Sequence, residues 1–305
     1  MGRFIVRRLL QGLILLFLVA GVVFILGRLT GNPADLMLPE DATAEDRVRL
    51  IAQLGLDGPL HTQFLKFIGN ALTGDLGTSI RMRQPAVEVF FSRLPNTLAI
   101  IPWAILFAMT IGIPLGVAAA LNRGNAIDRA AGTVAVLGIA MPSFWLGIIL
   151  IFVFSVELGW LPSGRMGGPE HYVLPVITLG TFLTAGFMRL TRSSMLDVME
   201  SEFVKLARIK GLSERTVIWK HCLRNAMIPL LTLWGVFVGN LITGAIVTET
   251  VFAWPGIGRL TYEAVIYRDF PLLQAVIILK SILILGINLL VDILYAFVDP
   301  RIRLS

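Results

Sequence analysis

Few side chains in this sequence have the type and spacing that enzyme or metal chemistry requires. The histidines His61, His171 and His221 are far apart, and none is accompanied by another metal ligand at helical spacing. A phosphate-binding P-loop needs glycine directly before its lysine, and the chain contains no Gly-Lys pair. Ser143 has no histidine or lysine near it in sequence that would make it a nucleophile. We therefore expect no metal site, no cofactor and no catalytic residue in this chain.

Ionisable side chains inside long apolar stretches are costly, so each is a candidate functional residue. Lys280 lies roughly 12 Å inside the last apolar stretch at 1.5 Å per residue, which is deep for complete snorkelling, so we expect it to face protein or water. Asn288 and Asp292 lie four residues apart and therefore share one helix face. A helix-packing contact near the headgroups explains this pair better than a substrate contact does.

A basic segment at residues 201–229 lies between two apolar stretches and has the pattern of two short helices joined by a tight turn. Gly211 tolerates the left-handed backbone that ends one helix, and Ser213 can cap the next. We expect a helical hairpin that contacts another protein at the membrane surface. The candidate contact residues are Lys205, Ala207, Arg208, Lys210, Gly211, Ser213 and Glu214.

Two other interpretations of this hairpin are open. Two helices around a tight turn also occur in DNA-binding proteins, but no surrounding helical domain supports that interpretation here, so we expect no nucleic-acid partner. A solvated loop that faces lipid headgroups is the simpler alternative.

The composition places these residues in a membrane protein. Of the 305 residues, 56% are hydrophobic and 15% are charged, with a mean hydropathy of +0.80, which a soluble domain could not cover with polar groups. The net charge of +6 and the pI near 9.9 suit contact with anionic membrane lipid. The single cysteine, Cys222, excludes an internal disulfide framework.

Apolar stretches long enough to cross a bilayer predict an all-α polytopic membrane protein with six transmembrane helices in a single domain, 1–305. The expected helices are at about 9–29, 96–121, 131–157, 172–190, 226–248 and 272–298. The first stretch follows basic residues as a signal peptide does, but no small-residue cleavage site comes after it, so we expect a retained helix. Prolines inside the stretches, such as Pro102, Pro114 and Pro142, can bend helices around a cavity.

The distribution of lysine and arginine predicts the orientation. Arg3, Arg7 and Arg8 precede the first helix, and basic residues also end the chain, which places both the N and C termini in the cytoplasm for an even number of crossings. Residues 189–225 then form a basic cytoplasmic loop, and residues 249–271 form an extracytoplasmic one. Residues 30–95 are extracytoplasmic as well, and a translocated segment of this length is largely exempt from the charge rule.

The segment 30–95 is too long for an idle connector, so we expect it to be structured. Asp57-Gly-Pro59 is typical of a turn, and the apolar residues from Phe64 through Leu72 recur at helical spacing. We expect an interfacial helix followed by a cap over an entrance. A helix that only rests on the headgroups is the alternative.

Nine ordered motifs resemble a known family along the whole chain. They are Gly55-Leu-Asp-Gly-Pro-Leu, Gly74-Asp-Leu-Gly-Thr-Ser79, Arg93-Leu-Pro-Asn-Thr-Leu98, Met141-Pro-Ser-Phe144, Leu158-Gly-Trp-Leu-Pro162, Leu174-Pro175, Ala207-Arg-Ile-Lys-Gly-Leu-Ser213, Glu249-Thr-Val-Phe-Ala-Trp-Pro-Gly-Ile-Gly258 and Val291-Asp-Ile-Leu-Tyr-Ala-Phe-Val-Asp-Pro300. In this order they look like the integral-membrane permease of the peptide, glutathione and nickel class of bacterial ABC importers.

The resemblance implies a type I permease fold in the bacterial inner membrane and transport by alternating access. It implies three kinds of protein partner beside the membrane lipid that the composition predicts. They are a second homologous permease subunit, two ATP-binding subunits that hold ATP and Mg, and an extracytoplasmic substrate-binding protein. It leaves the cargo open among dipeptides, oligopeptides, glutathione and nickel chelates. A secondary transporter or channel driven by an ion gradient is the alternative, but it predicts buried acidic coupling residues that we do not find in the five charge-free stretches.

The resemblance also implies roles for two groups of residues. In such permeases a cytoplasmic Glu-Ala-Ala motif, followed four residues later by glycine, docks on the ATPase, and Ala207 and Gly211 fit this spacing. Lys205 and Leu206 stand where that motif has Glu and Ala, so its glutamate salt bridge cannot be assumed. On the outer side we expect gate or docking residues, although an interfacial aromatic belt also accounts for tryptophan. The pathway candidates are Glu249, Phe252, Trp254, Pro255, Lys280, Asn288 and Asp292.

Overall fold

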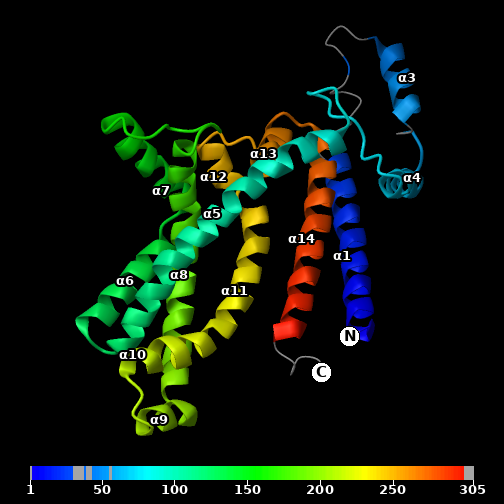
Figure 1. Ribbon diagram of the computed structural model, residues 1–305. Coiled ribbons are helices and arrows are strands. Elements are labelled where there is room, and N and C mark those ends of the chain that lie inside the picture. The colour runs from blue at the N-terminus through cyan, green and yellow to red at the C-terminus, as the bar shows by residue number, and fades with distance from the viewer. Residues whose placement is uncertain (1, 30–37, 39–42, 55–56, 299–305) are drawn as a thin grey trace. The chain divides into compact units, whose positions relative to one another are not determined.

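The computed structural model describes residues 2–29, 38, 43–54 and 57–298, and most of these residues are helical (Figure 1). The helices are α1 (Gly2–Leu29), α3 (Ala44–Leu54), α4 (Leu60–Leu72), α5 (Ala86–Leu121), α6 (Ala126–Ala140), α7 (Ser143–Leu150), η1 (Ile151–Glu157), α8 (Glu170–Met199), α9 (Glu202–Ile209), α10 (Glu214–Thr216), η2 (Val217–Cys222), α11 (Leu223–Gly244), α12 (Ile246–Val251), α13 (Ile257–Ile266) and α14 (Phe270–Val298). Within the described ranges, the one β-bridge joins Thr78 and Pro85.

Five helical stretches of the described chain are long and apolar enough to cross a membrane. They are Val6–Arg28, Ala86–Leu121, Glu170–Met199, Glu214–Ile242 and Phe270–Val291. A sixth span results if α6 and the α7–η1 pair are counted together, although these two are bent by 98° relative to each other. The all-helical, multi-span class predicted from the sequence is confirmed.

The bend replaces the single helix that the apolar stretch 131–157 predicts. Met141 has φ −74° and ψ 123°, which is the extended backbone that a following proline imposes. Pro142 has no N–H to donate to the preceding turn, so α6 ends and a new helix begins at Ser143. Pro102 and Pro114, by contrast, lie within the continuous helix α5.

The chain divides into two compact units, and the single domain expected from the sequence stays a prediction. The first unit comprises Met1–Asn96 and Pro255–Leu289, and the second comprises Thr97–Trp254 and Leu290–Ser305.

The first unit contains α1, α4, α13 and most of α14. In Figure 1, α1 and α14 lie side by side, and a Cβ atom on Gly12 of α1 would lie 3.7 Å from Leu285 of α14. Phe64 of α4 makes edge contacts with Phe17 and Phe24 of α1, at centroid distances of 5.6 and 5.3 Å. The interfacial position of α4 expected from the sequence stays a prediction, but its aromatic face does pack on a membrane-length helix.

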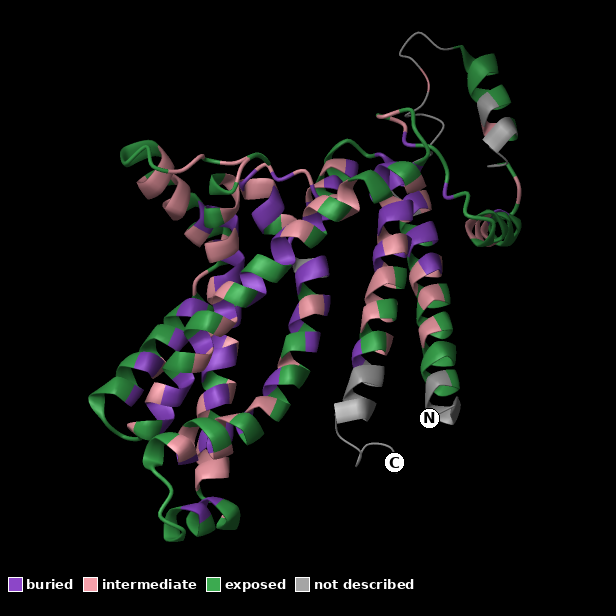
Figure 2. Ribbon diagram, viewed as in Figure 1, coloured by how far each residue is buried: buried purple, intermediate pink, exposed green. Residues whose placement is uncertain are grey.

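The second unit is built around α8, which packs against α6, α7 and α11. Helix α5 also approaches α8 closely, because Gly112 and Gly116 present no side chain to it. A Cβ atom on Gly112 would lie 2.7 Å from the carbonyl oxygen of Thr184, and one on Gly116 would lie 2.6 Å from that of Met188. Such glycine pairs let membrane helices pack backbone to backbone. Figure 2 shows that buried residues follow α8, whereas much of α1 is exposed.

Candidate coupling loop and pathway residues

The basic segment forms a helical hairpin at the end of α8. Ser201 has an extended backbone before α9 begins, and its hydroxyl donates to the carbonyl oxygen of Val198 at 2.5 Å. Helix α9 then buries Val204 and Ala207, which are 0% and 7% exposed. Both belong to a cluster that joins α5, α8, α9, η2 and α11 and consists of Val117, Ala120, Met195, Val204, Ala207, Val217, Cys222 and Ala226. The hairpin is therefore anchored in the core of the second unit.

The turn at Gly211 ends α9 with a Schellman motif. Gly211 has φ +76°, its N–H donates to the carbonyl oxygen of Arg208 at 2.9 Å, and the N–H of Leu212 donates to that of Ala207 at 3.3 Å. This pair of hydrogen bonds satisfies helix-end carbonyls and requires a left-handed residue at the glycine position. The glycine turn expected from the sequence is confirmed.

Ser213 caps the next helix, as its position predicted. Its hydroxyl accepts from the N–H of Thr216 at 3.4 Å, and the two side-chain oxygens of this pair are 2.9 Å apart. Across the turn, the Arg208 guanidinium donates from Nε to Oε1 of Glu214 at 2.8 Å. Lys205 pairs within α9 with Glu202 at 2.7 Å. Arg208, Glu214 and Lys205 are exposed, so these ion pairs contribute little to the stability of the hairpin.

The outward side of the hairpin is apolar as well as basic. Phe203, Leu206, Ile209 and Leu212 are 44%, 56%, 80% and 40% exposed. The first three recur every three residues on one side of α9, and Leu212 follows the turn that ends the helix. We name these four residues the apolar stripe. Lys210 is exposed beside the stripe. The apolar stripe is therefore exposed on the hairpin, whereas Ala207 lies inside the chain's own core.

An ion pair that sequence reasoning missed holds α6 to α8. The Arg192 guanidinium donates from Nε to Oδ1 of Asp128 at 2.5 Å and from Nη2 to Oδ2 at 2.8 Å, while the N–H of Gly124 donates to the same carboxylate at 2.9 Å. The pair joins residues 64 positions apart, and Arg192 lies near the end of α8, just before the hairpin. The one sequence signal is an acidic residue in the first turn of a helix, where it suits the helix dipole.

The expected gate residues are core residues in the second unit. Phe252 and Trp254 are both 0% exposed, and the Trp254 ring meets Tyr172 edge-on at 4.7 Å. The backbone N–H of Arg165 donates to the carbonyl oxygen of Phe252 at 2.7 Å. Glu249 is 1% exposed and accepts a hydrogen bond from the Thr97 hydroxyl at 2.6 Å.

In the first unit, Pro255 accepts a hydrogen bond on its carbonyl oxygen from the side-chain amide of Asn96 at 2.8 Å. Lys280 is 7% exposed, so its side chain lies inside the protein, as expected for a residue that faces protein or water. Asn288 is exposed on α14. The side chain of Asp292 lies outside the described residues. Of the six pathway candidates whose side chains are described, three thus belong to the second unit and three to the first. Their role in a pathway stays a prediction.

Asp269 is a further residue that sequence reasoning missed. It is 1% exposed and accepts from the Ser79 hydroxyl at 2.5 Å and from the N–H groups of Ile80 and Arg81 at 3.1 Å each. It also accepts from the N–H of Leu272 in the first turn of α14 at 3.3 Å. The carboxylate therefore fastens the loop of the Gly74–Ser79 motif to the start of α14.

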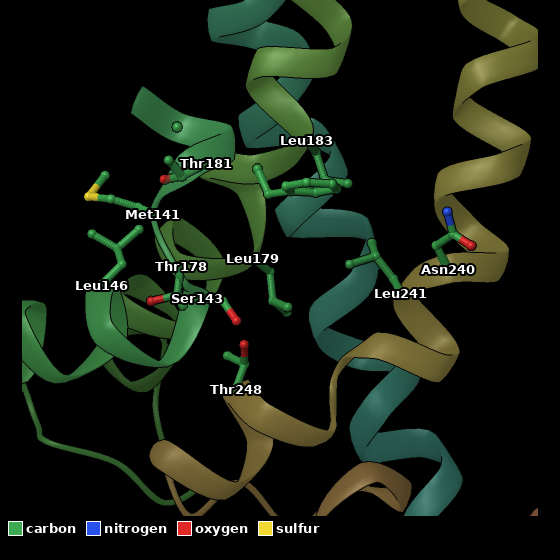
Figure 3. A pocket seen from close by; sticks show the side chains of 12 residues that line it. Met141, Ser143, Leu146, Thr178, Leu179, Thr181, Leu183, Asn240, Leu241 and Thr248 are labelled. Carbon is green, nitrogen blue, oxygen red and sulfur yellow. The ribbon is translucent and has the colours of Figure 1, made fainter. Parts of the chain in front are cut away.

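A cavity of about 410 Å³ lies within the second unit (Figure 3). Its lining residues come from the α6–α7 turn, α8, α11 and α12: Gly138, Met141, Ser143, Leu146, Thr178, Leu179, Thr181, Phe182, Leu183, Asn240, Leu241 and Thr248. The polar groups among them are uncharged hydroxyls and one amide. This lining can hydrogen-bond a polar ligand without an ion pair.

Two family matches cover most of the chain. Residues 112–304 match the family described as the inner membrane component of binding-protein-dependent transport systems, and residues 1–101 match the N-terminal part of such a membrane component. The chain belongs to this family. Its members are the permease subunits of ABC importers, so the protein is a transport subunit, multi-pass in the bacterial inner membrane, that works with partner ATPases and a substrate-binding protein.

Curated relatives of this permease match it along its full length. The glutathione transport system permease protein GsiC of Escherichia coli strain K12 is 44% identical over 304 residues, 99% of both chains. GsiC of Salmonella typhimurium strain LT2 is 43% identical over the same length and share. The resemblance to peptide- and glutathione-class permeases is thereby confirmed, and the matches give no support to an ion-gradient-driven transporter.

Solved structures show the fold of the permease. An inward-facing conformation of the MetNI methionine ABC transporter superposes with a TM-score of 0.60 at 19% identity, covering 69% of this chain and 96% of that one. An amino acid ABC transporter crystallised with histidines gives a TM-score of 0.50 at 20% identity, covering 68% and 93%. At these identities the likeness establishes the ABC importer permease fold.

Proposed function

We propose that this permease forms half of a translocation pathway for peptides or related small solutes, such as glutathione or nickel chelates. The supporting observation is the identity of 43–44% to glutathione permeases over 99% of the chain. The other half is a second homologous permease subunit. Two ATP-binding subunits hold ATP and Mg, an extracytoplasmic protein delivers the cargo, and this chain itself carries no cofactor.

The segment 189–225, which includes most of the hairpin, is the proposed coupling loop, with both chain termini on the same, cytoplasmic side. Lys205, Arg208 and Lys210 face outward around the apolar stripe, where their charges suit an acidic rim on the ATPase. Four other candidates act indirectly, through the structure of the hairpin. Ala207 anchors α9 in the core and Gly211 forms the turn. Ser213 caps the next helix, and Glu214 pairs with Arg208. An ATPase movement that pushes on the stripe is transmitted through Val204 and Ala207 into the core of the second unit.

The docking proposal is tested with Ile209→Asp, because Ile209 is the most exposed residue of the apolar stripe at 80%. We expect the variant to reach the membrane normally but to lose co-purification with the ATPase subunits. The introduced aspartate would lose its hydration at the buried contact without gaining a counter-charge. The matched control is Val48→Asp on α3, where Val48 is 66% exposed. Equal recovery of ATPase with both variants would contradict the docking proposal.

The cargo proposal is tested by uptake into proteoliposomes that contain the complete complex, ATP and the binding protein. Glutathione, a dipeptide and a nickel chelate are offered separately, each with and without ATP. We expect ATP-dependent accumulation of at least one of them. Accumulation of none, with an active ATPase, would contradict the proposed cargo class.

A further inference from the structure

The cavity of the second unit contains a buried hydroxyl that the protein itself does not satisfy. Thr248 is 1% exposed, and its Oγ1 has no hydrogen-bond partner among the described residues. In Figure 3 this hydroxyl points toward the side of the cavity where Ser143 and Thr178 lie. An unpaired buried polar group destabilises a protein, so its presence calls for an explanation.

The other two threonines that line the cavity can only accept a hydrogen bond from a ligand. The hydroxyl of Thr178 donates to the carbonyl oxygen of Leu174 at 2.8 Å, and that of Thr181 donates to Ile177 at 2.7 Å. Because each hydroxyl has a single proton, these two oxygens can offer only lone pairs to a ligand. The hydroxyl of Thr248 can still donate or accept.

Two interruptions of helical backbone border the same cavity. Met141 and Ser143 flank the proline break between α6 and α7, while Leu241 and Thr248 lie on either side of the α11–α12 junction. Irregular backbone at membrane depth is tolerated where it is buried in protein or lines a cavity. The size of about 410 Å³ also falls in the range of small-molecule sites, roughly 300–1,000 Å³.

We propose that this cavity is a cargo subsite that binds uncharged N–H donors, and specifically the amide groups of a peptide. The acceptor oxygens of Thr178 and Thr181, in a lining without a charged residue, suit an amide N–H and leave a carboxylate or a metal ion without a counter-charge. The terminal charges of the peptide therefore lie outside the cavity. This inference rests on the proposed peptide-class cargo, and it assigns Thr248 as a residue that selects for the amide N–H.

The test compares two ligands in two variants of the complete complex. The ligands are glutathione and a glutathione analogue with methyl groups on both amide nitrogens, which has lost the N–H donors. The variants are Thr248→Val, which keeps the shape and removes the hydroxyl, and Thr133→Val as control. Thr133 is an exposed threonine of α6 outside the cavity. The measured quantity is the ratio of the uptake rates of the two ligands. Discrimination by the binding protein cancels, because that protein is the same throughout.

We expect wild type and Thr133→Val to share one ratio and Thr248→Val to lower it roughly two- to tenfold, as for one lost hydrogen bond. Thr248→Val should also raise the melting temperature of the unliganded complex, because it removes an unsatisfied hydroxyl. An unchanged ratio with continued glutathione uptake would overturn the subsite and leave the proposed function intact. If wild type takes up a nickel chelate but no peptide, the subsite alone fails. If it takes up neither peptide, glutathione nor nickel chelate, the proposed function fails as well.

A second variant covers the case in which Thr248→Val does not assemble. Thr181→Val removes an acceptor from the same cavity and should lower the same ratio. If neither variant that assembles changes the ratio, the cavity does not bind cargo amides.

Discussion

At the scale of single residues, the coupling loop depends on backbone conformation more than on charge. Gly211 adopts φ +76°, and a Cβ atom at this position would meet nothing within 4 Å. A larger side chain is therefore disfavoured by the backbone alone, by roughly 1–2 kcal/mol for a left-handed residue. Among residues other than glycine, asparagine is one of those that tolerate this region best.

This distinction predicts different outcomes at Gly211. Gly211→Val should uncouple ATP hydrolysis from uptake, because the β-branched residue distorts the turn that directs α9. Gly211→Asn should keep most of the uptake. The measurement is the ratio of ATP hydrolysed to cargo accumulated in proteoliposomes. Normal coupling in Gly211→Val would show that the turn is not the coupling element.

The Asp128–Arg192 pair makes a second prediction at this scale. Asp128→Ala should lower the melting temperature of the solubilised protein, because it leaves the half-buried Arg192 guanidinium without its bidentate partner. The control is Arg123→Ala, since Arg123 and Glu200 form an ion pair whose side chains are 64% and 74% exposed. Such exposed pairs contribute little. Equal melting temperatures for the two variants would argue against a structural role of Asp128.

At the scale of elements, the contact between α5 and α8 is set by glycine. Gly112 and Gly116 lie one helical turn apart, and at Gly116 a Cβ atom would lie 2.6 Å both from the carbonyl oxygen of Met188 and from the Cβ of Thr191. Neither neighbour is the flexible end of a side chain, so the helices would have to separate. This contact adjoins the cluster that anchors α9, because Val117 and Ala120 follow directly on α5.

We therefore expect Gly116→Ala to destabilise the permease by about 1–3 kcal/mol, the usual cost of overpacking. Gly132→Ala is the matched control, because a Cβ atom at Gly132 of α6 meets nothing within 4 Å and alanine favours helix. The melting temperatures of the two variants are measured by thermal unfolding in detergent. A melting temperature for Gly116→Ala at or above that of the parent protein would refute the close packing.

At the scale of the whole molecule, α8 is long and apolar enough to connect two loops across a membrane. Its 30 residues extend roughly 45 Å at 1.5 Å per residue, more than the hydrocarbon core of about 30 Å. The loop before α8 carries Arg165 as its one basic residue, whereas the loop after it is the basic hairpin. This asymmetry predicts a cytoplasmic hairpin.

Reporter fusions test that orientation. A fluorescent protein that folds only in the cytoplasm should be active when it is inserted after Leu212 or at the C terminus. A phosphatase that is active only outside the cytoplasm should be active when it is inserted after Gly159, in the loop before α8. The reverse pattern at either loop would invert the topology and remove the coupling proposal.

The sequence by itself determined the features that local chemistry controls. Apolar length and charge identified a multi-span helical membrane protein, the ordered motifs identified its family, and Gly211 with Ser213 identified the turn of the hairpin. The break between α6 and α7 follows from Pro142, although the apolar stretch around this proline predicted one helix. These features depend on residues within a few positions of one another, because backbone propensity and capping act over one helical turn.

Only the tertiary structure decided which side chains face inward. It buried Ala207, Phe252 and Trp254, which the sequence had offered as contact or gate residues. It paired Asp128 with Arg192 and Ser79 with Asp269, 64 and 190 residues apart, and it left the Thr248 hydroxyl unsatisfied in a cavity between helices. In a chain where most helix faces are apolar, hydrophobic periodicity cannot tell the lipid side from the core. Packing between helices makes that choice.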